Sequence, residues 1–493
     1  MFRSMRGSAK KHFQKTLSLM QKGKFKEALK ELEKAEESAQ KAKADDIFLS
    51  LQTIKGHLMQ TLGEHEEALK IYSLAIKATE DLLLKDPDNE YYQSSLQMNF
   101  DAIFTLGNLS HSKGLFLEAK DFYELNLSIF QEILKTDPEN VTYQSYLGTT
   151  LNNLGNLFFD MGHIEEAKQK YEEALGTYET LLKKDTENIE YQSYIGKTFN
   201  NLGNLLKSTA HIEEAKESYE KALNIYGKLL KTAPKSVAYQ SDVATALNNL
   251  GMLLSDIGRT EEAKEKYEKA LDIYETLLKK DTGNVAYQSD AAVTLNNLGN
   301  LLKNMDRIEE SKQRCEKSLE MRQKILKTDP QNIAHQSDVA MTLNNLGILL
   351  SNMDRMEEAK DKYEKALDIY EKILKTDPEN IAYQSYVGTI LNNSGVLLSD
   401  IGRIEESKQR YEKALEMRLK LLKSDVENAT YQLDVATTLN NLGTLFFEKG
   451  QKEEAKENFK KALEILEPLS KKDPENKKLK EELSFTQEKL ESL

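Results

Sequence analysis

A glycine recurs at a fixed interval of 48 residues along most of this 493-residue chain. Each copy follows leucine, or serine in one case, and most copies stand inside a Leu-Asn-Asn-Leu-Gly segment. A sequence period of this length is typical of stacked supersecondary units that share a continuous core. The pattern therefore predicts a solenoid and argues against a single globular core. The recurring glycines are Gly107, Gly155, Gly203, Gly251, Gly299, Gly347, Gly395 and Gly443.

The repeat around Gly347 shows what one unit contains. Apolar residues fall at helical spacing over 333–350, after a turn at Pro330, which predicts a first helix. A second apolar stripe over about 356–375 predicts a second helix that ends before Pro378. Six of the seven prolines occupy this turn between units, while Pro468 is expected to interrupt the last repeat helix.

The apolar and small residues of each unit resemble the tetratricopeptide repeat, with leucine in place of the usual tryptophan. The resemblance covers roughly residues 13–470. The family repeat has about 34 residues, so each helix here gains about seven, close to two turns, and keeps its apolar face inward. Similarly lengthened repeats with a Leu-Asn-Asn-Leu segment are seen in kinesin light chains. The motif in one unit is Leu151-x-x-Leu154-Gly155-x-x-Phe158, then Ala167-x-x-x-Tyr171, then Ala174.

The resemblance implies an all-α, right-handed superhelical solenoid of about ten antiparallel helix pairs with a C-terminal capping helix. Four segments are expected along the chain. They are a basic N-terminus with a degenerate first repeat (1–43), an irregular repeat (44–88), eight tandem 48-residue repeats (89–473) and a polar capping helix (474–493).

Composition and charge exclude several classes of function. The net charge of −13 disfavours nucleic-acid binding, which needs a basic stripe. No apolar run is long enough to span a membrane, and the single cysteine, Cys315, predicts neither disulfides nor a thiolate metal site. A reducing, cytoplasmic setting is the default. The first 26 residues are basic and are interpreted as a solvated first helix, with an organelle-targeting segment as the alternative.

The sequence predicts no enzyme, no cofactor and no metal. Repeats account for nearly all residues between about 13 and 470, and no phosphate-binding loop, zinc motif or nucleophile elbow is present. Paired glutamates such as Glu165-Glu166 begin the second helices, where acidic groups favour the positive end of the helix dipole. Cys315 replaces the tyrosine of its sister repeats and is interpreted as a core residue.

An asparagine-rich stripe on the first helices is the candidate binding surface. The resemblance implies that first helices line a concave groove, so that this stripe faces a ligand. An amide both donates and accepts, so the stripe can pair with the backbone of an extended peptide. The other interpretation is that the asparagines keep the groove wet or bond to the next helix. The candidate residues are Asn152, Asn153, Asn156, Asn200, Asn201, Asn204, Asn248, Asn249, Asn296, Asn297, Asn300, Asn344, Asn345, Asn392, Asn393, Asn440 and Asn441.

Carboxylates lie two turns earlier on the same stripe, at Asp242, Asp290, Asp338 and Asp434. They predict a protein or peptide partner with a preference for basic segments. The expected function is thus a non-enzymatic scaffold that binds an extended or helical segment in its groove. The alternative is an architectural or self-assembling spacer that works through its ends or convex face. Nothing in the pattern indicates a homo-oligomer, and the sequence does not name the partner or pathway.

Overall fold

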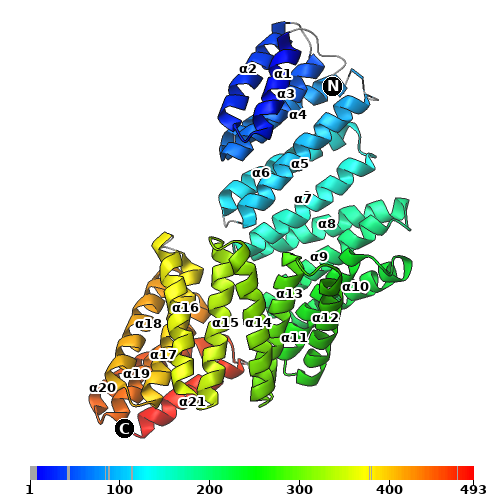
Figure 1. Cartoon of the computed structure of the whole chain (residues 1–493). Helices are drawn as coiled ribbons and strands as arrows, with labels where there is room; N and C mark the ends of the chain where they lie inside the picture. Colours follow the sequence, from blue (N-terminus) through cyan, green and yellow to red (C-terminus); the bar gives the residue numbers. More distant parts are fainter. Residues whose placement is uncertain are drawn as a thin grey trace. The chain divides into compact units, whose positions relative to one another are not determined.

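The computed structural model describes residues 8–41, 45–83, 85–86, 89–112, 115–376, 378, 380–474 and 476–493. Over these residues the chain is all-α, and its 21 helices pack in consecutive pairs, as predicted (Figure 1). The chain divides into two compact units, residues 1–234 and 235–493, and each is described by itself. The four expected segment boundaries stay a prediction.

Unit 1 holds five helix pairs, and in each pair the odd-numbered helix is called the first helix. The helices are α1 (Ser8–Gln21), α2 (Phe25–Lys41), α3 (Asp45–Leu62), α4 (His65–Leu83), α5 (Glu90–Ser112), α6 (Phe116–Thr136), α7 (Val141–Asp160), α8 (Ile164–Lys184), α9 (Ile189–Ser208) and α10 (Ile212–Thr232).

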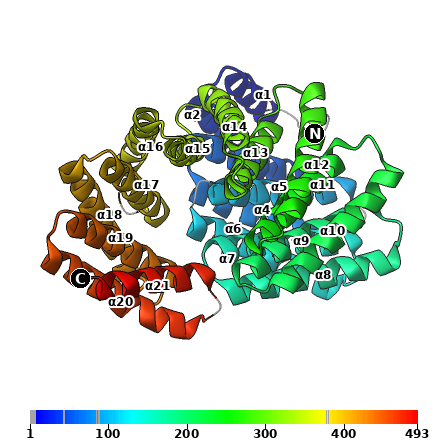
Figure 2. The same ribbon diagram turned by 90° about the horizontal axis from the view of Figure 1, so that it is seen from below.

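Unit 2 holds five further pairs and a final single helix, α21, which lies beside α20 at the C-terminal end (Figure 1 and Figure 2). The helices are α11 (Val237–Asp256), α12 (Thr260–Lys280), α13 (Val285–Asn304), α14 (Ile308–Thr328), α15 (Ile333–Asn352), α16 (Met356–Thr376), α17 (Ile381–Asp400), α18 (Ile404–Ser424), α19 (Ala429–Glu448), α20 (Lys452–Lys472) and α21 (Lys477–Glu491).

Side-chain caps start the first helices from α7 to α19. The Asn140 side chain accepts the backbone N–H of Tyr143, and an asparagine or, at α11, Ser236 does the same in the later repeats. Such a cap satisfies one of the backbone donors that a helix start leaves unpaired. The second helices α8, α10, α12, α14, α18 and α20 have no side-chain cap but carry two glutamates in their first turn, which suits the helix dipole.

Close approach between the two helices of a pair explains the recurring glycine. A Cβ atom built on Gly155 would lie 2.5 Å from a ring carbon of Tyr171, which comes from α8 and is 1% exposed. Leu154 and Ala167 are buried around the same contact, as the motif predicts. Glycine is therefore required by the tyrosine ring that packs onto it, and not by its backbone conformation.

The two ends of the repeat array test two sequence expectations, the basic first helix and the interruption at Pro468. Helix α1 packs against α2 and buries Phe13, and Gly23 follows it with a φ of 70°, in agreement with a first helix that ends there. Arg3 and Arg6 of the basic segment lie outside the described residues. The expected interruption at Pro468 was wrong, because α20 continues through it. Its ring lies exposed and proline removes only one backbone donor there.

None of the described helices is long and apolar enough to cross a membrane.

The turn inside each repeat gives a stability prediction. The second residue after the first helix adopts a left-handed conformation, and it is glycine in most repeats, such as Gly258 with a φ of 77°, but alanine at Ala210 with a φ of 60°. That conformation costs an L-residue about 1–2 kcal/mol. We expect Ala210→Gly to raise the free energy of unfolding by about 0.5–1 kcal/mol, after the entropy of the more flexible unfolded chain is subtracted.

The matched variant Gly258→Ala should lower the free energy of unfolding by a similar amount. No atom lies within 4 Å of a Cβ placed on Gly258, so backbone strain is the only cost there. Urea denaturation followed by circular dichroism measures both changes. Equal stability of the two variants and the parent would contradict the assignment of strain to Ala210.

Candidate functional site

The asparagine side chains of neighbouring first helices are hydrogen-bonded to one another. In six repeats the second asparagine of the segment that corresponds to Leu-Asn-Asn-Leu donates Nδ2 to an asparagine Oδ1 of the preceding repeat, at 2.9–3.2 Å. We call these contacts the amide pairs. They are Asn153–Asn108, Asn201–Asn152, Asn297–Asn248, Asn345–Asn296, Asn393–Asn344 and Asn441–Asn392. Asn200 and Asn249 occupy the same positions on α9 and α11.

The amide pairs bear on the two interpretations of the stripe. Bonding to the next helix is observed at six positions. It does not use the whole amide, since an asparagine side chain carries two N–H donors and an oxygen with two lone pairs. The acceptors Asn248, Asn296 and Asn392 are buried, whereas the donors, such as Asn297 and Asn345, are half-buried. Peptide binding by the donor side chains stays a prediction.

The remaining asparagines of the stripe have individual surroundings. Asn156 and Asn204 accept hydrogen bonds from Tyr171 at 2.8 Å and Tyr219 at 2.7 Å, which joins the two helices of a pair. Asn300 lies in the repeat where Cys315 replaces that tyrosine.

Helix α21 covers the last asparagine of the array. Asn440 donates to Glu482 at 3.0 Å and accepts from Thr486 at 3.1 Å. Asn108 was not among the predicted residues, although it follows Gly107 as Asn156 follows Gly155. The repeat position was therefore the signal that could have found it.

Two of the four predicted carboxylates lie beside a buried guanidinium that the sequence analysis overlooked. Arg322 and Arg418 are 6% and 4% exposed, and each has a guanidinium nitrogen 3.8 Å from a carboxylate oxygen, of Asp338 and Asp434 respectively. Each arginine also donates to the backbone carbonyl of that aspartate. The sequence signal was that Arg322 and Arg418 replace a core tyrosine of the sister repeats, such as Tyr274.

The other two carboxylates have no arginine at the corresponding position. Asp242 and Asp290 are half-buried on α11 and α13. Burial raises the pKa of Asp290 above its usual value, and a hydrogen bond from Tyr274 partly opposes that increase. The positions that correspond to Arg322 and Arg418 are tyrosines here, Tyr226 and Tyr274.

The single cysteine is part of the core. Cys315 is fully buried, and its Sγ lies against Gly299 where other repeats place a tyrosine ring. Burial raises the pKa of its thiol to about 12, so the thiol is protonated at neutral pH. Among the described residues, no group of three or more His, Cys, Asp or Glu side chains is placed to hold a metal ion.

Stacked helix pairs, joined through amides on their first helices, define a helical repeat protein. Sequence models described as tetratricopeptide repeat match residues 147–187, 196–228 and 243–282, and also the overlapping stretches 290–372, 338–420 and 386–467. Together the matches span more than half of the chain, which therefore belongs to the tetratricopeptide repeat family. Members of this family generally mediate interactions between proteins. No curated protein matches the sequence.

Several solved structures are similar to this chain. BtubC (BKLC) from P. vanneervenii is 21% identical and has a TM-score of 0.41, over 52% of this chain and 92% of that chain. The apo form of RapI is 16% identical with a TM-score of 0.45, over 66% and 99%. The pilF protein of Pseudomonas aeruginosa is 19% identical with a TM-score of 0.33, over 59% and 97%.

Proposed function

We propose that this protein is a non-enzymatic scaffold that binds an extended or helical segment of another protein across its first helices. The observation that carries the proposal is the amide pairing. In six repeats one half-buried asparagine is held in a fixed orientation by its bond to the preceding repeat. A side chain ordered before binding loses less entropy when a ligand arrives. Its second N–H can then donate to a backbone carbonyl of the bound segment.

The charge on the same surface supports a basic partner. Asp242 and Asp290 lie two helical turns before the Asn-Asn segments of their repeats, and the positions that correspond to Arg322 and Arg418 are tyrosines there. Carboxylates placed in this way attract lysine or arginine and accelerate association at low salt. Association should therefore slow as ionic strength rises.

The test removes three donor amides from unit 2. We expect the triple variant Asn297→Ala, Asn345→Ala, Asn393→Ala to weaken partner binding by about tenfold or more, since three lost hydrogen bonds of about 0.5–1.5 kcal/mol each add up to at least about 1.5 kcal/mol. The partner is first identified by affinity capture from a native lysate and mass spectrometry. Its affinity for the purified parent and variant is then measured by calorimetry, after circular dichroism shows both to be folded.

A second triple variant serves as the control. Lys269→Ala, Lys365→Ala and Lys461→Ala change exposed positions on second helices of the same unit, where each lysine makes only a surface ion pair. Its affinity for the partner should equal that of the parent. If the asparagine variant also binds normally, the partner does not use the amides, and binding through the ends or the other face becomes the better explanation.

A further inference from the structure

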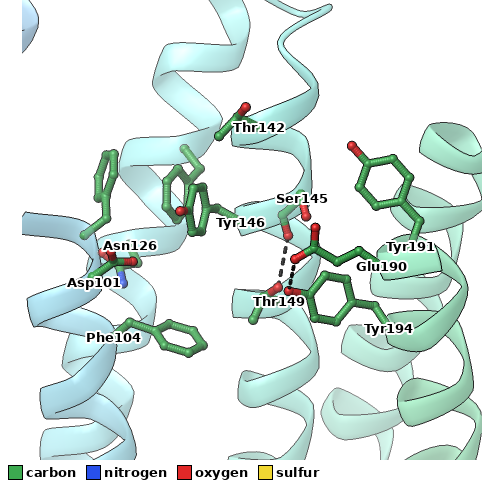
Figure 3. A pocket seen from close by; sticks show the side chains of 12 residues that line it. Asp101, Phe104, Asn126, Thr142, Ser145, Tyr146, Thr149, Glu190, Tyr191 and Tyr194 are labelled. Atoms are coloured by element: carbon green, nitrogen blue, oxygen red, sulfur yellow. Dashed lines mark hydrogen bonds between the residues drawn. The ribbon is translucent and has the colours of Figure 1, made fainter. Parts of the chain in front are cut away.

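Unit 1 contains a cavity of about 330 Å³ on the side of its first helices (Figure 3). Side chains of α5 and α6, including Asp101, Phe104 and Asn126, form one side of it. Tyr146 of α7 lies in the middle, and Glu190 and other residues of α9 form the opposite side. The cavity thus extends over three successive first helices.

Departures from the repeat pattern in α5 and α6 account for the cavity. Phe100 stands where the later repeats carry glycine or alanine, such as Gly148, and Phe104 replaces the first asparagine of the Leu-Asn-Asn-Leu segment. Asn126 replaces the alanine that in most repeats is fully buried between helices, such as Ala174. Larger side chains keep helices further apart. In agreement, α5 and α6 contact one another less extensively than α7 and α8 do.

Asn126 is the unusual group in this cavity. Its side chain is 1% exposed, and neither Nδ2 nor Oδ1 has a hydrogen-bond partner. A buried amide without partners costs stability, and buried polar groups of proteins are nearly always paired. Most other repeats use alanine here at no such cost. An unpaired amide that lines a cavity therefore indicates a site whose ligand completes its hydrogen bonds.

The remaining lining residues select for positive charge. Asp101 and Glu190 are exposed carboxylates on opposite sides of the cavity, and among the described lining residues there is no Lys, Arg or His. Burial raises the pKa of Tyr146 to about 12, and the Asp101 and Glu190 carboxylates add to the increase. The electrostatic potential in the cavity is therefore negative.

The aromatic walls are fixed by stacking. Tyr146 stacks on Phe130 with ring centroids 5.6 Å apart, and Tyr194 stacks on Tyr178 at 5.0 Å. Tyr194 also donates a hydrogen bond to Glu190 at 2.9 Å. Flat aromatic faces held in place beside carboxylates suit a planar cation.

We propose that this cavity binds an arginine side chain carried by a partner protein. A guanidinium stacks on aromatic rings and has five N–H donors, which suit the Asp101 carboxylate and Oδ1 of Asn126, while Glu190 adds negative charge on the opposite side. A guanidinium is more weakly hydrated than an ammonium group, so it loses less when it enters a partly closed cavity. A water held with it can accept from Nδ2 of Asn126. The inference deepens the proposed function and rests on it, because a bound protein segment must supply the arginine.

The test uses short peptides on the full chain. Ligand-observed NMR titration compares acetyl-Gly-Arg-Gly-amide with the peptides that carry lysine or glutamine in place of arginine. We expect the arginine peptide to bind about fivefold or more tightly than either, since it gains charge-assisted hydrogen bonds and stacking together. Asn126→Ala and Asp101→Asn should each weaken its binding by about fivefold, which corresponds to one hydrogen bond.

The controls separate the site from general effects. Asp121→Asn removes an exposed carboxylate of α6 that does not line the cavity, and it should leave arginine-peptide binding unchanged. Asn126→Ala restores the residue that most repeats carry, so its midpoint of thermal unfolding should rise. The exposed variant Asp101→Asn gives an answer even if Asn126→Ala fails to fold.

Three results would overturn the inference: no binding of the arginine peptide, equal binding of the glutamine peptide, or normal binding by both cavity variants. The triple asparagine variant of unit 2 should still bind the arginine peptide. If the cavity fails these tests while that triple variant loses its protein partner, the cavity inference is wrong and the proposed function stands. If the triple variant binds its partner normally while the cavity variants lose the arginine peptide, the partner does not use the amides and the arginine site in the cavity stands.

Discussion

Gly347→Ala is expected to lower the free energy of unfolding by about 3 kcal/mol, near the upper end for overpacked cores. A Cβ at this position would lie 2.6 Å from a ring carbon of Tyr363, whose side chain is 2% exposed. The ring cannot move aside without disturbing the buried residues around it. Denaturation by urea measures the loss. Because repeat arrays can unfold in parts, hydrogen exchange of α15 and α16 should show where stability is lost.

Gly176→Ala is the matched control. Gly176 lies inside α8, is exposed, and has no atom within 4 Å of the position its Cβ would take. Alanine there should raise stability by about 0.5–1 kcal/mol through helix propensity. The cost of Gly347→Ala should also shrink in a Tyr363→Leu background, because the clashing ring is gone. A similar small effect at both glycines would show that the tyrosine ring does not impose the glycine period.

Asp434→Asn is expected to lower the free energy of unfolding by about 2 kcal/mol, because it leaves the Arg418 guanidinium buried without its nearest opposite charge. The two side chains are 3.8 Å apart and 5% and 23% exposed. This loss is smaller than that for a fully buried ion pair because the aspartate is partly exposed. Arg418 also keeps its hydrogen bonds to the Asp434 carbonyl and to Thr438. Thermal and urea unfolding of the purified protein measure the change.

Asp290 occupies the position of Asp434 in another repeat. Asp290→Asn should raise the free energy of unfolding instead of lowering it. Burial raises the pKa of Asp290, so the folded chain binds the proton more tightly than the unfolded chain. The ionised carboxylate therefore costs stability at neutral pH, and this cost disappears as pH falls through the raised pKa toward the unfolded value of about 3.9. The variant should be more stable than the parent at pH 7 and lose that advantage at low pH. If both Asp→Asn variants lost the same free energy of unfolding, Arg418 would not be the cause of the loss at Asp434.

The fold could be predicted because its determinants are local and repeated. A 48-residue period, two apolar stripes and a glycine opposite a tyrosine recur in most units, so one unit predicts the next. The asparagine stripe was also visible from helical spacing. Its bonds were not, because the contact between Asn297 and Asn248 depends on how one first helix lies against the next. Helical spacing within one helix does not contain that information.

The cavity and the buried arginines could not be predicted from the sequence for a related reason. Phe100, Asn126 and Arg322 are visible as departures from the repeat pattern. Whether such a departure is repacked, opens a space or finds a partner is decided by three-dimensional contacts around it. The sequence therefore located the unusual positions without revealing that Asn126 lacks partners or that Arg322 lies beside Asp338.

The amide pairs make the array tolerant of changes in length. A typical repeat carries an acceptor asparagine and a donor asparagine side by side, as Asn344 and Asn345 do. If a whole repeat were duplicated or deleted, the same amide pair would form at the new junction, and no asparagine there would lose its hydrogen-bond partner. The terminal acceptor, Asn440, is satisfied by Glu482 and Thr486 of α21. Evolution could thus lengthen or shorten such a chain in 48-residue steps while keeping one closing helix.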